Sequence, residues 1–305
     1  MKVLVTGGAG FIGSNIVDKL IELGNTVIVV DNESTDCHET FYWNDHAENY
    51  KYDICDYDKI EPLFNGVDCV FHLAAEARIQ PSIQNPTLTA KTNVYGTCNV
   101  LQAAKENDVK RFVYSSTSAS YGLKNVAPVD ENMTPDCLNA YSITKCAGED
   151  LCKMFHRMYG METVIFRYFN VYGETQSPDG PYAQVLAVFL EQVRKKLPLT
   201  INGKGNQTRD FTYVGDIVDG IILAGENTKY EFKGKAINLG RGDSYSIFDI
   251  AKRLGKSYIF NPPNPGENPH DMADITRAEH LLGWKPSMNV LEWLDTQASR
   301  DPLMM

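Results

Sequence analysis

Two side chains that can transfer protons stand four residues apart in the segment Tyr141-Ser142-Ile143-Thr144-Lys145. On a helix this spacing puts Tyr141 and Lys145 on one face. A free tyrosine has a pKa of about 10 and is a poor base at neutral pH, but a nearby ammonium stabilises its phenolate. The pair therefore predicts a tyrosine base supported by a lysine. The same spacing is also typical of a solvated helix face, so the surrounding elements must decide between the two.

Further reactive groups lie in the hydroxyl-rich turn over 115–120, which follows the apolar run 111–115. The run predicts a strand, and open parallel sheets bind ligands at the carboxyl ends of their strands. Thr117 is the candidate to donate to, or accept from, a reacting oxygen. The alternative for any one of these hydroxyls is a turn residue that bonds its own backbone.

A glycine-rich loop offers a binding function of another kind. It reads Thr6-Gly7-Gly8-Ala9-Gly10-Phe11-Ile12-Gly13. Glycine permits close approach of a phosphate to the backbone, and the N-terminus of a following helix favours negative charge. The loop stands between a predicted strand, 2–6, and a predicted helix, 14–23, and a second strand over 26–30 leads into Asp31. This βαβ context predicts a dinucleotide site in which Asp31 binds the ribose hydroxyls and repels a 2′-phosphate, so we expect NAD rather than NADP. The alternative is a tight turn without a ligand.

The elements that must position these groups alternate along the chain. Apolar strands are predicted over 67–73, 111–115 and 163–167, and helices over 87–107 and 141–159. Strands and helices in this order predict an α/β fold with a doubly wound parallel sheet, a Rossmann fold. The second predicted helix would carry both Tyr141 and Lys145.

The pattern changes after about residue 172. A loop over 177–181 is followed by a predicted helix over 183–197, a turn at 202–203 and two short helices near 274–282 and 289–298. We therefore expect a Rossmann domain over 1–172 and a smaller C-terminal α/β domain over 173–305 that binds the substrate. Parts of 209–240 are expected to return to the first domain, because 236–239 reads as one more strand.

Composition excludes several classes of function. The 305 residues are 43% hydrophobic and 22% charged, which is typical of a globular enzyme. The formal net charge of −10, without a basic stripe, argues against nucleic acid as a partner. No run approaches the roughly 18 apolar residues of a membrane span, and the early strand argues against a signal peptide. The seven cysteines form no CxxC pair, so we expect a reducing, cytoplasmic compartment and no metal site.

Taken together, the motifs resemble those of the extended short-chain dehydrogenase/reductases, specifically the NAD-dependent sugar epimerase/dehydratase family. The resemblance covers nearly the whole chain and rests on TGGAGFIG at 6–13, DN at 31–32, HLAAEA at 72–77, TNVYGT at 92–97, SSTSASYG at 115–122, YSITK at 141–145, RYFNVYG at 167–173, QTRDFTYVGDIVDG at 207–220 and ADITRAEHLLGWKP at 273–286. It implies tightly bound NAD, a UDP-sugar substrate and a homodimer formed through a helix pair that includes the helix carrying Tyr141.

The resemblance also implies roles for individual residues. Thr117, Tyr141 and Lys145 match the catalytic trio. The implied NAD contacts are Gly7, Gly10, Phe11, Ile12 and Gly13 at the pyrophosphate, Asp31 and Asn32 at the ribose, Asp53 and Ile54 at the adenine, and Leu73, Ala74, Ala75, Asn93, Ser115, Tyr141, Lys145 and Phe169 along the rest of the cofactor, with Phe169 beside the nicotinamide. The implied substrate contacts are Thr117, Asn170, Gln184, Val185, Arg209 and Asp271, with Arg209 pairing with the nucleotide diphosphate.

One departure from the family pattern narrows the reaction. Related 4,6-dehydratases carry Asp-Glu directly after the catalytic Thr, and related decarboxylases keep a Glu at the second of these positions. This chain has Ser118 and Ala119 there. The resemblance therefore favours a 4-epimerase similar to the UDP-glucose and UDP-N-acetylglucosamine enzymes. A UDP-glucuronate 4-epimerase, a dehydratase with unusual acids, a ketoreductase with exchanging cofactor and a non-catalytic NAD-sensing module remain alternatives.

Two further positions bear on the substrate. Related 4-epimerases usually place an Arg before the G-[DE] of a C-terminal loop as a second diphosphate partner, and Asn264 of Asn264-Pro265-Gly266-Glu267 replaces it here. The family's gate on pocket width falls on Asp271, where a Tyr restricts the pocket to plain hexoses. A small Asp is expected to admit a 2-N-acetyl group and to disfavour a uronic acid by like-charge repulsion. The alternative is that Asp271 points to solvent and gates nothing.

Overall fold

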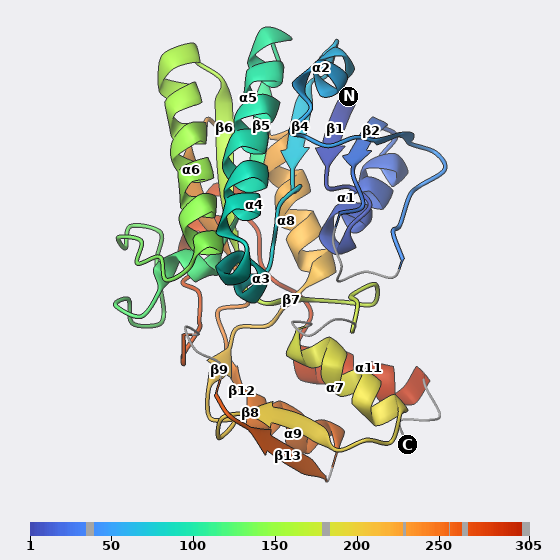
Figure 1. Cartoon of the computed structure of the whole chain (residues 1–305), viewed down its shortest axis with the longest axis vertical. Helices are drawn as coiled ribbons and strands as arrows, with labels where there is room; N and C mark the ends of the chain where they lie inside the picture. The colour runs from blue at the N-terminus through green and yellow to red at the C-terminus, as the bar shows by residue number, and fades with distance from the viewer. Residues whose placement is uncertain (35–39, 179–183, 228–229, 256, 264–267, 301–305) are drawn as a thin grey trace.

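The computed structural model describes residues 1–34, 40–178, 184–227, 230–255, 257–263 and 268–300. Its centre is a seven-stranded sheet in which every neighbouring pair is parallel (Figure 1). The spatial order is β11 (Lys235–Leu239), β6 (Glu162–Tyr168), β5 (Arg111–Thr117), β4 (Cys69–His72), β1 (Lys2–Thr6), β2 (Thr26–Asp31) and β3 (Glu48–Lys51). The chain order reverses between β1 and β4, which creates the switch point where such sheets bind ligands. The predicted Rossmann fold is confirmed.

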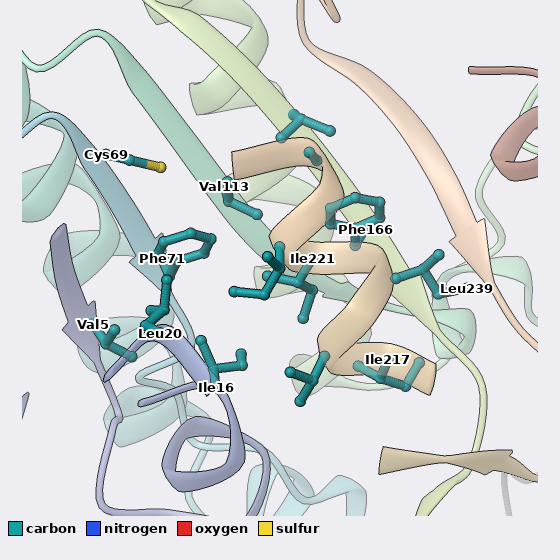
Figure 2. Packing of buried hydrophobic residues seen from close by; sticks show 14 of the residues in the cluster. Val5, Ile16, Leu20, Cys69, Phe71, Val113, Phe166, Ile217, Ile221 and Leu239 are labelled. Carbon is teal, nitrogen blue, oxygen red and sulfur yellow. The ribbon is translucent and has the colours of Figure 1, made fainter. Parts of the chain in front are cut away.

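Helices cover both faces of the sheet, which explains why its strands are apolar throughout. On one face lie α1 (Phe11–Glu22) and α8 (Val214–Glu226), and Figure 2 shows Ile217 and Ile221 of α8 packed among Val113 and Phe166 of the strands. The other face is covered by α2 (Tyr57–Ile60), a 3₁₀ turn (Glu61–Phe64), α5 (Thr97–Glu106) and α6 (Ala140–Tyr159). The two apolar layers hold the carboxyl ends of β1, β4, β5 and β6 in fixed relation.

The predicted helix over 87–107 is present but changes its winding. It begins as α4 (Pro86–Ala90), widens into a π-helical segment (Lys91–Gly96) and continues as α5. In the widened segment the Asn93 side chain accepts from Glu76 N at 2.7 Å and donates to Glu76 O at 3.1 Å and Thr144 Oγ1 at 3.0 Å. Widened turns of this kind recur at functional sites, and this one joins the loop after β4 to α6.

A smaller group of elements follows β6 and has its own apolar core. It comprises α7 (Val185–Arg194), α9 (Ile247–Leu254), α11 (Val290–Arg300) and the parallel pair β8 (Leu199–Asn202) and β13 (Tyr258–Asn261). The remaining elements are α3 (Ile79–Gln84), a 3₁₀ turn (Ser118–Tyr121), α10 (Thr276–Leu282) and the short pairs β7 (Val171–Tyr172) with β10 (Thr212–Tyr213) and β9 (Thr208–Arg209) with β12 (Tyr245–Ser246). Figure 1 shows the smaller group below the main sheet.

The chain then crosses back to the first sheet. Helix α8 packs against α1, and β11 pairs with β6 in register from Lys235 opposite Val164 to Leu239 opposite Tyr168. Within the described residues, no helix has the length and apolar content needed to cross a membrane.

The buried His72 makes the stability of this fold depend on pH. Its side chain lies between Thr6 Oγ1 at 2.6 Å and Thr97 Oγ1 at 2.9 Å, and the residue is 1% exposed. Burial, aided by the charge of Lys145, lowers the pKa of His72 to about 3. Between that value and the unfolded pKa of about 6.5, the unfolded chain binds more protons, so His72 lowers the free energy of unfolding by about 1.4 kcal/mol per unit of falling pH. Urea unfolding between pH 6 and pH 4 should give a shallower dependence for His72→Gln than for the wild type. Equal slopes would contradict a neutral buried imidazole.

Candidate active site

A cavity of about 810 Å³ opens at the carboxyl ends of β5 and β6. Thr117, Ser118, Tyr141 and Asn170 line it from the sheet side, and elements of the smaller group line it opposite them. Its volume is within the range of small-molecule sites, about 300–1,000 Å³. Tyr141 and the predicted substrate residues therefore line one cavity, at the edge of the sheet where ligands are expected, whereas Lys145 is not among its lining residues.

The start of α6 is fixed by its own cap, and this fixes Tyr141 in the first turn. Asn139 Oδ1 accepts from Ser142 N at 2.9 Å, while Ser142 Oγ lies 3.3 Å from Asn139 N as a reciprocal cap. The backbone N–H of Tyr141 donates to Ser82 Oγ of α3 at 3.0 Å. Capping side chains of this kind satisfy N–H groups that the helix leaves unpaired. Tyr141 is therefore held from both sides before any ligand binds.

The electrostatic surroundings of Tyr141 differ in part from the prediction. Burial raises the pKa of Tyr141 above its ordinary value, while a hydrogen bond with Thr117 and the positive charge of Arg78 lower it. The link between Tyr141 and Thr117 joins the predicted base to the predicted oxygen-binding hydroxyl. Arg78 lines the cavity beside them, although the sequence analysis did not select it. Its place shortly after the strand-end motif HLAAEA was the signal available.

Lys145 lies below Tyr141 on the same helix and is 4% exposed. Its Nζ donates to the carbonyl of Ser115 at 2.9 Å and lies 5.3 Å from the ring centre of Tyr114. Burial lowers the pKa of Lys145 to about 8. The predicted shared helix face is present, but this contact directs the ammonium to the end of β5.

A buried ion pair lies one turn further along α6. Glu149 is 1% exposed and Arg167 is 3% exposed. Arg167 donates to the Glu149 carboxylate from Nε at 2.8 Å and from Nη2 at 2.7 Å. Glu149 also accepts from Ser116 Oγ at 2.6 Å, which fixes the strand next to Thr117. The spacing Tyr141, Lys145, Glu149 repeats every four residues, so the sequence did contain a signal for this third member of the helix face.

The glycine loop has the close packing that a phosphate-binding turn requires. Gly7 has φ +71°, and a Cβ there would lie 2.6 Å from Ala74 N. A Cβ at Gly13 would lie 2.0 Å from Gly7 O, whereas one at Gly10 would meet no atom closer than 3.5 Å. The loop is thus packed against β4 on one side and leaves Gly10 and the N-terminus of α1 free of such contacts on the other. This arrangement fits a pyrophosphate.

Asp31 closes the same region from the end of β2. Its Oδ2 accepts from Ala9 N at 3.1 Å and its Oδ1 from Glu33 N at 2.8 Å. These bonds hold the carboxylate beside the glycine loop, as a ribose-binding acid requires. Together with the loop, the donor set fits NAD.

The other predicted cofactor residues occupy several environments. Leu73, Ala74 and Ala75 follow β4 and are half-buried, Asn93 is buried where it fixes Glu76, and the Ser115 Oγ contacts Tyr168 OH at 2.8 Å. Asn32 accepts a hydrogen bond from Ser34 N, and Asp53 accepts one from Cys55 N. Ile54 is buried against Gly96.

Phe169 is not among the residues that line the cavity. It is 0% exposed and packs with Tyr121, Val129 and Ala273 in a small separate cluster. These neighbours cover the ring, and the contact with the nicotinamide that the resemblance implies stays a prediction. The neighbouring residue, Asn170, faces the cavity instead.

The predicted substrate residues line the cavity together. Asn170, at φ +27°, donates to Asp271 Oδ2 at 2.7 Å and to Asp210 O at 3.1 Å. Arg209 Nη1 donates to Thr208 O and Asn268 O, both at 2.9 Å, and Gln184 and Val185 lie at the start of α7. The suggestion that Asp271 points to solvent is wrong. The Asn264 substitution lies outside the described residues.

A second carboxylate, Asp210, organises this wall and escaped the sequence analysis. It is buried and accepts from Arg241 N at 2.6 Å, Gly242 N at 3.0 Å and Ala273 N at 2.9 Å. Burial raises the pKa of Asp210 to about 7 despite these bonds. The loop after β11 and the loop that contains Asp271 are thereby tied to one side chain.

The fold and the site together define an NAD-binding enzyme of the short-chain dehydrogenase/reductase type. The family model described as NAD dependent epimerase/dehydratase matches residues 3–240. The chain therefore belongs to the NAD-dependent epimerase/dehydratase family, and NAD is its cofactor.

Relatives and solved structures agree with this assignment. The chain is 40% identical over 298 residues to a putative UDP-glucose 4-epimerase of Methanocaldococcus jannaschii, with 95% of each chain covered. It is similar to the structure of a Thermotoga maritima UDP-glucose 4-epimerase with UDP-glucose, with a TM-score of 0.89, 36% identity and coverage of 97% and 99%. A Bacillus cereus UDP-glucuronic acid 4-epimerase in complex with UDP-glucuronic acid and NAD has a TM-score of 0.87, 32% identity and coverage of 98% of each chain.

Proposed function

We propose that the chain epimerises C4 of a UDP-hexose or UDP-N-acetylhexosamine through a 4-keto intermediate. The observation that carries the proposal is that Tyr141 and Thr117 line the same cavity together with Ser118 and Ala119. A base and an oxygen-binding hydroxyl suffice for reversible oxidation at one carbon. Elimination or decarboxylation would need the acid that positions 118 and 119 lack. The names of the relatives described above support the same reaction.

Each of these residues has a separate role in the reaction. Tyr141 takes the proton from the sugar 4-hydroxyl and returns it after the ring has turned over in the cavity. Thr117 holds the 4-oxygen through both steps. Lys145 fixes the carbonyl two residues before Thr117 and, by its positive charge, favours the phenolate once NAD is bound. Arg209 binds the diphosphate and Asn170 the sugar. NAD, when bound, supplies the hydride acceptor and donor, so no net redox change results.

We assign the cofactor contacts to the glycine loop and its neighbours. Gly7, Gly10, Phe11, Ile12 and Gly13 hold the pyrophosphate at the N-terminus of α1. The other contacts are Asp31 and Asn32 at the ribose, Asp53 and Ile54 at the adenine, and Leu73, Ala74, Ala75, Asn93, Ser115 and Lys145 along the remainder. The close approach at Gly7 and the exposed backbone at Gly10 support this assignment.

The test is incubation with a panel of UDP-sugars followed by separation of C4 epimers. We expect interconversion of at least one C4 pair without added cofactor and without accumulation of NADH. Stoichiometric NADH turnover would instead identify a ketoreductase, and an absorbing 4-keto-6-deoxy product a dehydratase. If no sugar is changed while NAD binds, the proposed reaction is wrong.

The cofactor prediction follows from Asp31. A 2′-phosphate would meet its carboxylate, so we expect NAD to bind at least about 100-fold more tightly than NADP, a difference of roughly 2.7 kcal/mol. Calorimetric titration of cofactor-free protein with each dinucleotide measures the ratio. The Asp31→Ser variant should narrow the ratio, whereas equal affinities in the wild type would refute the assignment.

Asp271 carries a prediction on pocket width. We expect the wild type to accept UDP-N-acetylglucosamine, because the small side chain leaves room for an acetamide. Asp271→Tyr should lower kcat/KM for UDP-N-acetylglucosamine relative to UDP-glucose by about tenfold or more, the usual cost of losing pocket volume. Asp271→Asn, which keeps the size, is the matched control. A Tyr variant with an unchanged ratio would show that position 271 is no gate.

We further propose a cytoplasmic homodimer and a boundary near residue 172 between the NAD-binding and nucleotide-sugar-binding domains, with 214–239 part of the first. Exposed apolar side chains on α6 support a helix-pair interface, namely Ile143, Met154, Met158 and Tyr159. Light scattering after gel filtration tests the dimer.

A further inference from the structure

Arg78 places a positive charge in the cavity wall that the reaction above does not use. It lines the same cavity as Tyr141 and Thr117 and is half-buried. Its backbone is the extended cap residue of α3, and α3 is tied to α6 by the bond from Tyr141 N to Ser82 Oγ. The position of Arg78 beside the catalytic residues is therefore fixed by the packing of two helices.

The guanidinium has no protein partner to explain this position. Among the described residues, Arg78 takes part in no hydrogen bond or ion pair of its side chain. Arg167, by contrast, is bound twice by Glu149, and Arg209 donates to two carbonyls. Partial burial of an unpaired charge is unfavourable unless a ligand pairs with it. A planar guanidinium with its donors free is suited to a carboxylate or phosphate.

The location of Arg78 distinguishes between a carboxylate and a phosphate as its ligand. Arg209 lines the cavity from β9, in the part of the chain that follows β6, and is assigned to the diphosphate. Arg78 precedes α3, and Ser82 of α3 accepts a hydrogen bond from the backbone of Tyr141, so Arg78 lies on the same side of the cavity as Tyr141. Since Tyr141 and Thr117 act at C4, the substituents within reach are those on C3 and C5 of the sugar. A second anionic group at either position would meet Arg78.

Asp271 does not cancel this charge. Its carboxylate is bound by Asn170 at 2.7 Å, and a hydrogen bond with Ser118 and the charge of Arg209 also act on it. Arg78, Arg209 and Asp271 are the charged residues among those that line the cavity in the described part of the chain. The wall is thus positive by one charge.

We propose that Arg78 binds a carboxylate carried next to C4 of the sugar, so that the preferred substrates are UDP-sugar acids. The proposal rests on the proposed C4 epimerisation and reverses the expectation that Asp271 disfavours a uronic acid. The carboxylate belongs either to a hexuronic acid, at C5, or to an acid linked through the C3 oxygen. The sugar ring turns over in the cavity during the proposed reaction. A contact between Arg78 and the carboxylate in one of these two ring orientations is enough to raise the affinity for the acid.

The test compares kcat/KM for UDP-glucuronate, UDP-N-acetylmuramate, UDP-glucose and UDP-N-acetylglucosamine. In the wild type we expect one of the two acids to be preferred to its neutral counterpart, and which acid it is identifies the position of the carboxylate. Arg78→Gln should reduce the ratio of acid to neutral substrate by about 30-fold or more, as for a lost charge-assisted hydrogen bond. Arg78→Lys should retain part of it, because it keeps the charge but not the fork.

Lys110→Gln is the matched control for the loss of one positive charge. Lys110 is exposed and precedes β5, at the end about 20 Å from Thr117 by strand length. If Arg78→Gln and Lys110→Gln have the same ratio of kcat/KM for acid to neutral substrate, the proposal is wrong.

Binding measured by calorimetry separates this proposal from the reaction. Titration of UDP-glucuronate and UDP-glucose into wild type and Arg78→Gln needs no turnover. An Arg78-dependent preference for the acid, with no epimer formed from any sugar, would support the carboxylate site and refute the C4 reaction. Epimerisation of neutral sugars alone, with no effect of Arg78→Gln on either measurement, would support the C4 reaction and refute the carboxylate site.

Discussion

Tyr141→Phe should lose about 10³-fold in kcat while binding NAD as the wild type does. The ring and its packing stay, and only the hydroxyl that bonds Thr117 and exchanges the proton is removed. Positioned acid–base groups contribute about 10²–10⁴-fold. The measurements are the initial rate of C4 epimer formation and, separately, calorimetric titration with NAD.

Lys145→Ala provides the contrast. Its ammonium donates to Ser115 O and is assigned to the cofactor as well, so both NAD affinity and rate should fall. A Tyr141→Phe enzyme that keeps more than a tenth of its activity would remove Tyr141 from the role of base. Equal losses of NAD affinity in both variants would show that Tyr141 acts by packing alone.

Gly13→Ala should cost both stability and cofactor binding. The added Cβ would lie 2.0 Å from Gly7 O and 2.8 Å from Gly8 Cα, which are backbone atoms of the phosphate loop. Displacing them should lower the free energy of unfolding by about 3 kcal/mol, the upper range for overpacking. NAD affinity should fall by about 100-fold if two charge-assisted bonds to the loop are lost, each worth roughly 1.5 kcal/mol.

Gly10→Ala is the matched variant at the other side of the loop. Its Cβ would meet Gly7 O at 3.5 Å, an ordinary contact, and Gly10 has φ −81°. Thermal unfolding of the cofactor-free protein should therefore match the wild type, while NAD binding weakens because the methyl group stands where a phosphate is to approach. If Gly10→Ala binds NAD normally, the pyrophosphate lies elsewhere.

Local periodicity was enough to predict β1, β2, β4, β5 and β6 of the main sheet, but not its edge strand β3. Strands over 2–6 and 163–167 and the helix over 141–159 are present within a residue or two, because apolar strands between helices leave few alternatives. The π-helical turn at Asn93 could not be predicted from spacing. It depends on the hydrogen bonds of one amide to Glu76 and Thr144, residues brought near only by the folded chain.

The site shows the same limit. Tyr141, Thr117 and Asp31 were identifiable because each belongs to a short motif with a chemical reason. Arg78 belongs to none of the motifs, and its place in the cavity wall depends on the docking of α3 on α6. Phe169 shows the opposite case, since a motif position implies a cofactor contact that the sequence cannot relate to the burial of the ring against Tyr121 and Ala273.

The return of the chain to β11 has a consequence for the order in which the protein can form during synthesis. When the ribosome has released residues 1–172, the dinucleotide loop and Tyr141 are already present, but the β6 edge lacks its neighbour and Phe166 lacks Ile217 and Ile221 (Figure 2). Emerging chains tend to fold domain by domain from the N-terminus. The sheet of the first domain, however, is complete only when residues up to 239 have been made. A gene fragment ending at residue 172 would therefore encode every catalytic group and still yield an aggregating product, whereas one that continues through β11 would supply the missing edge and cover.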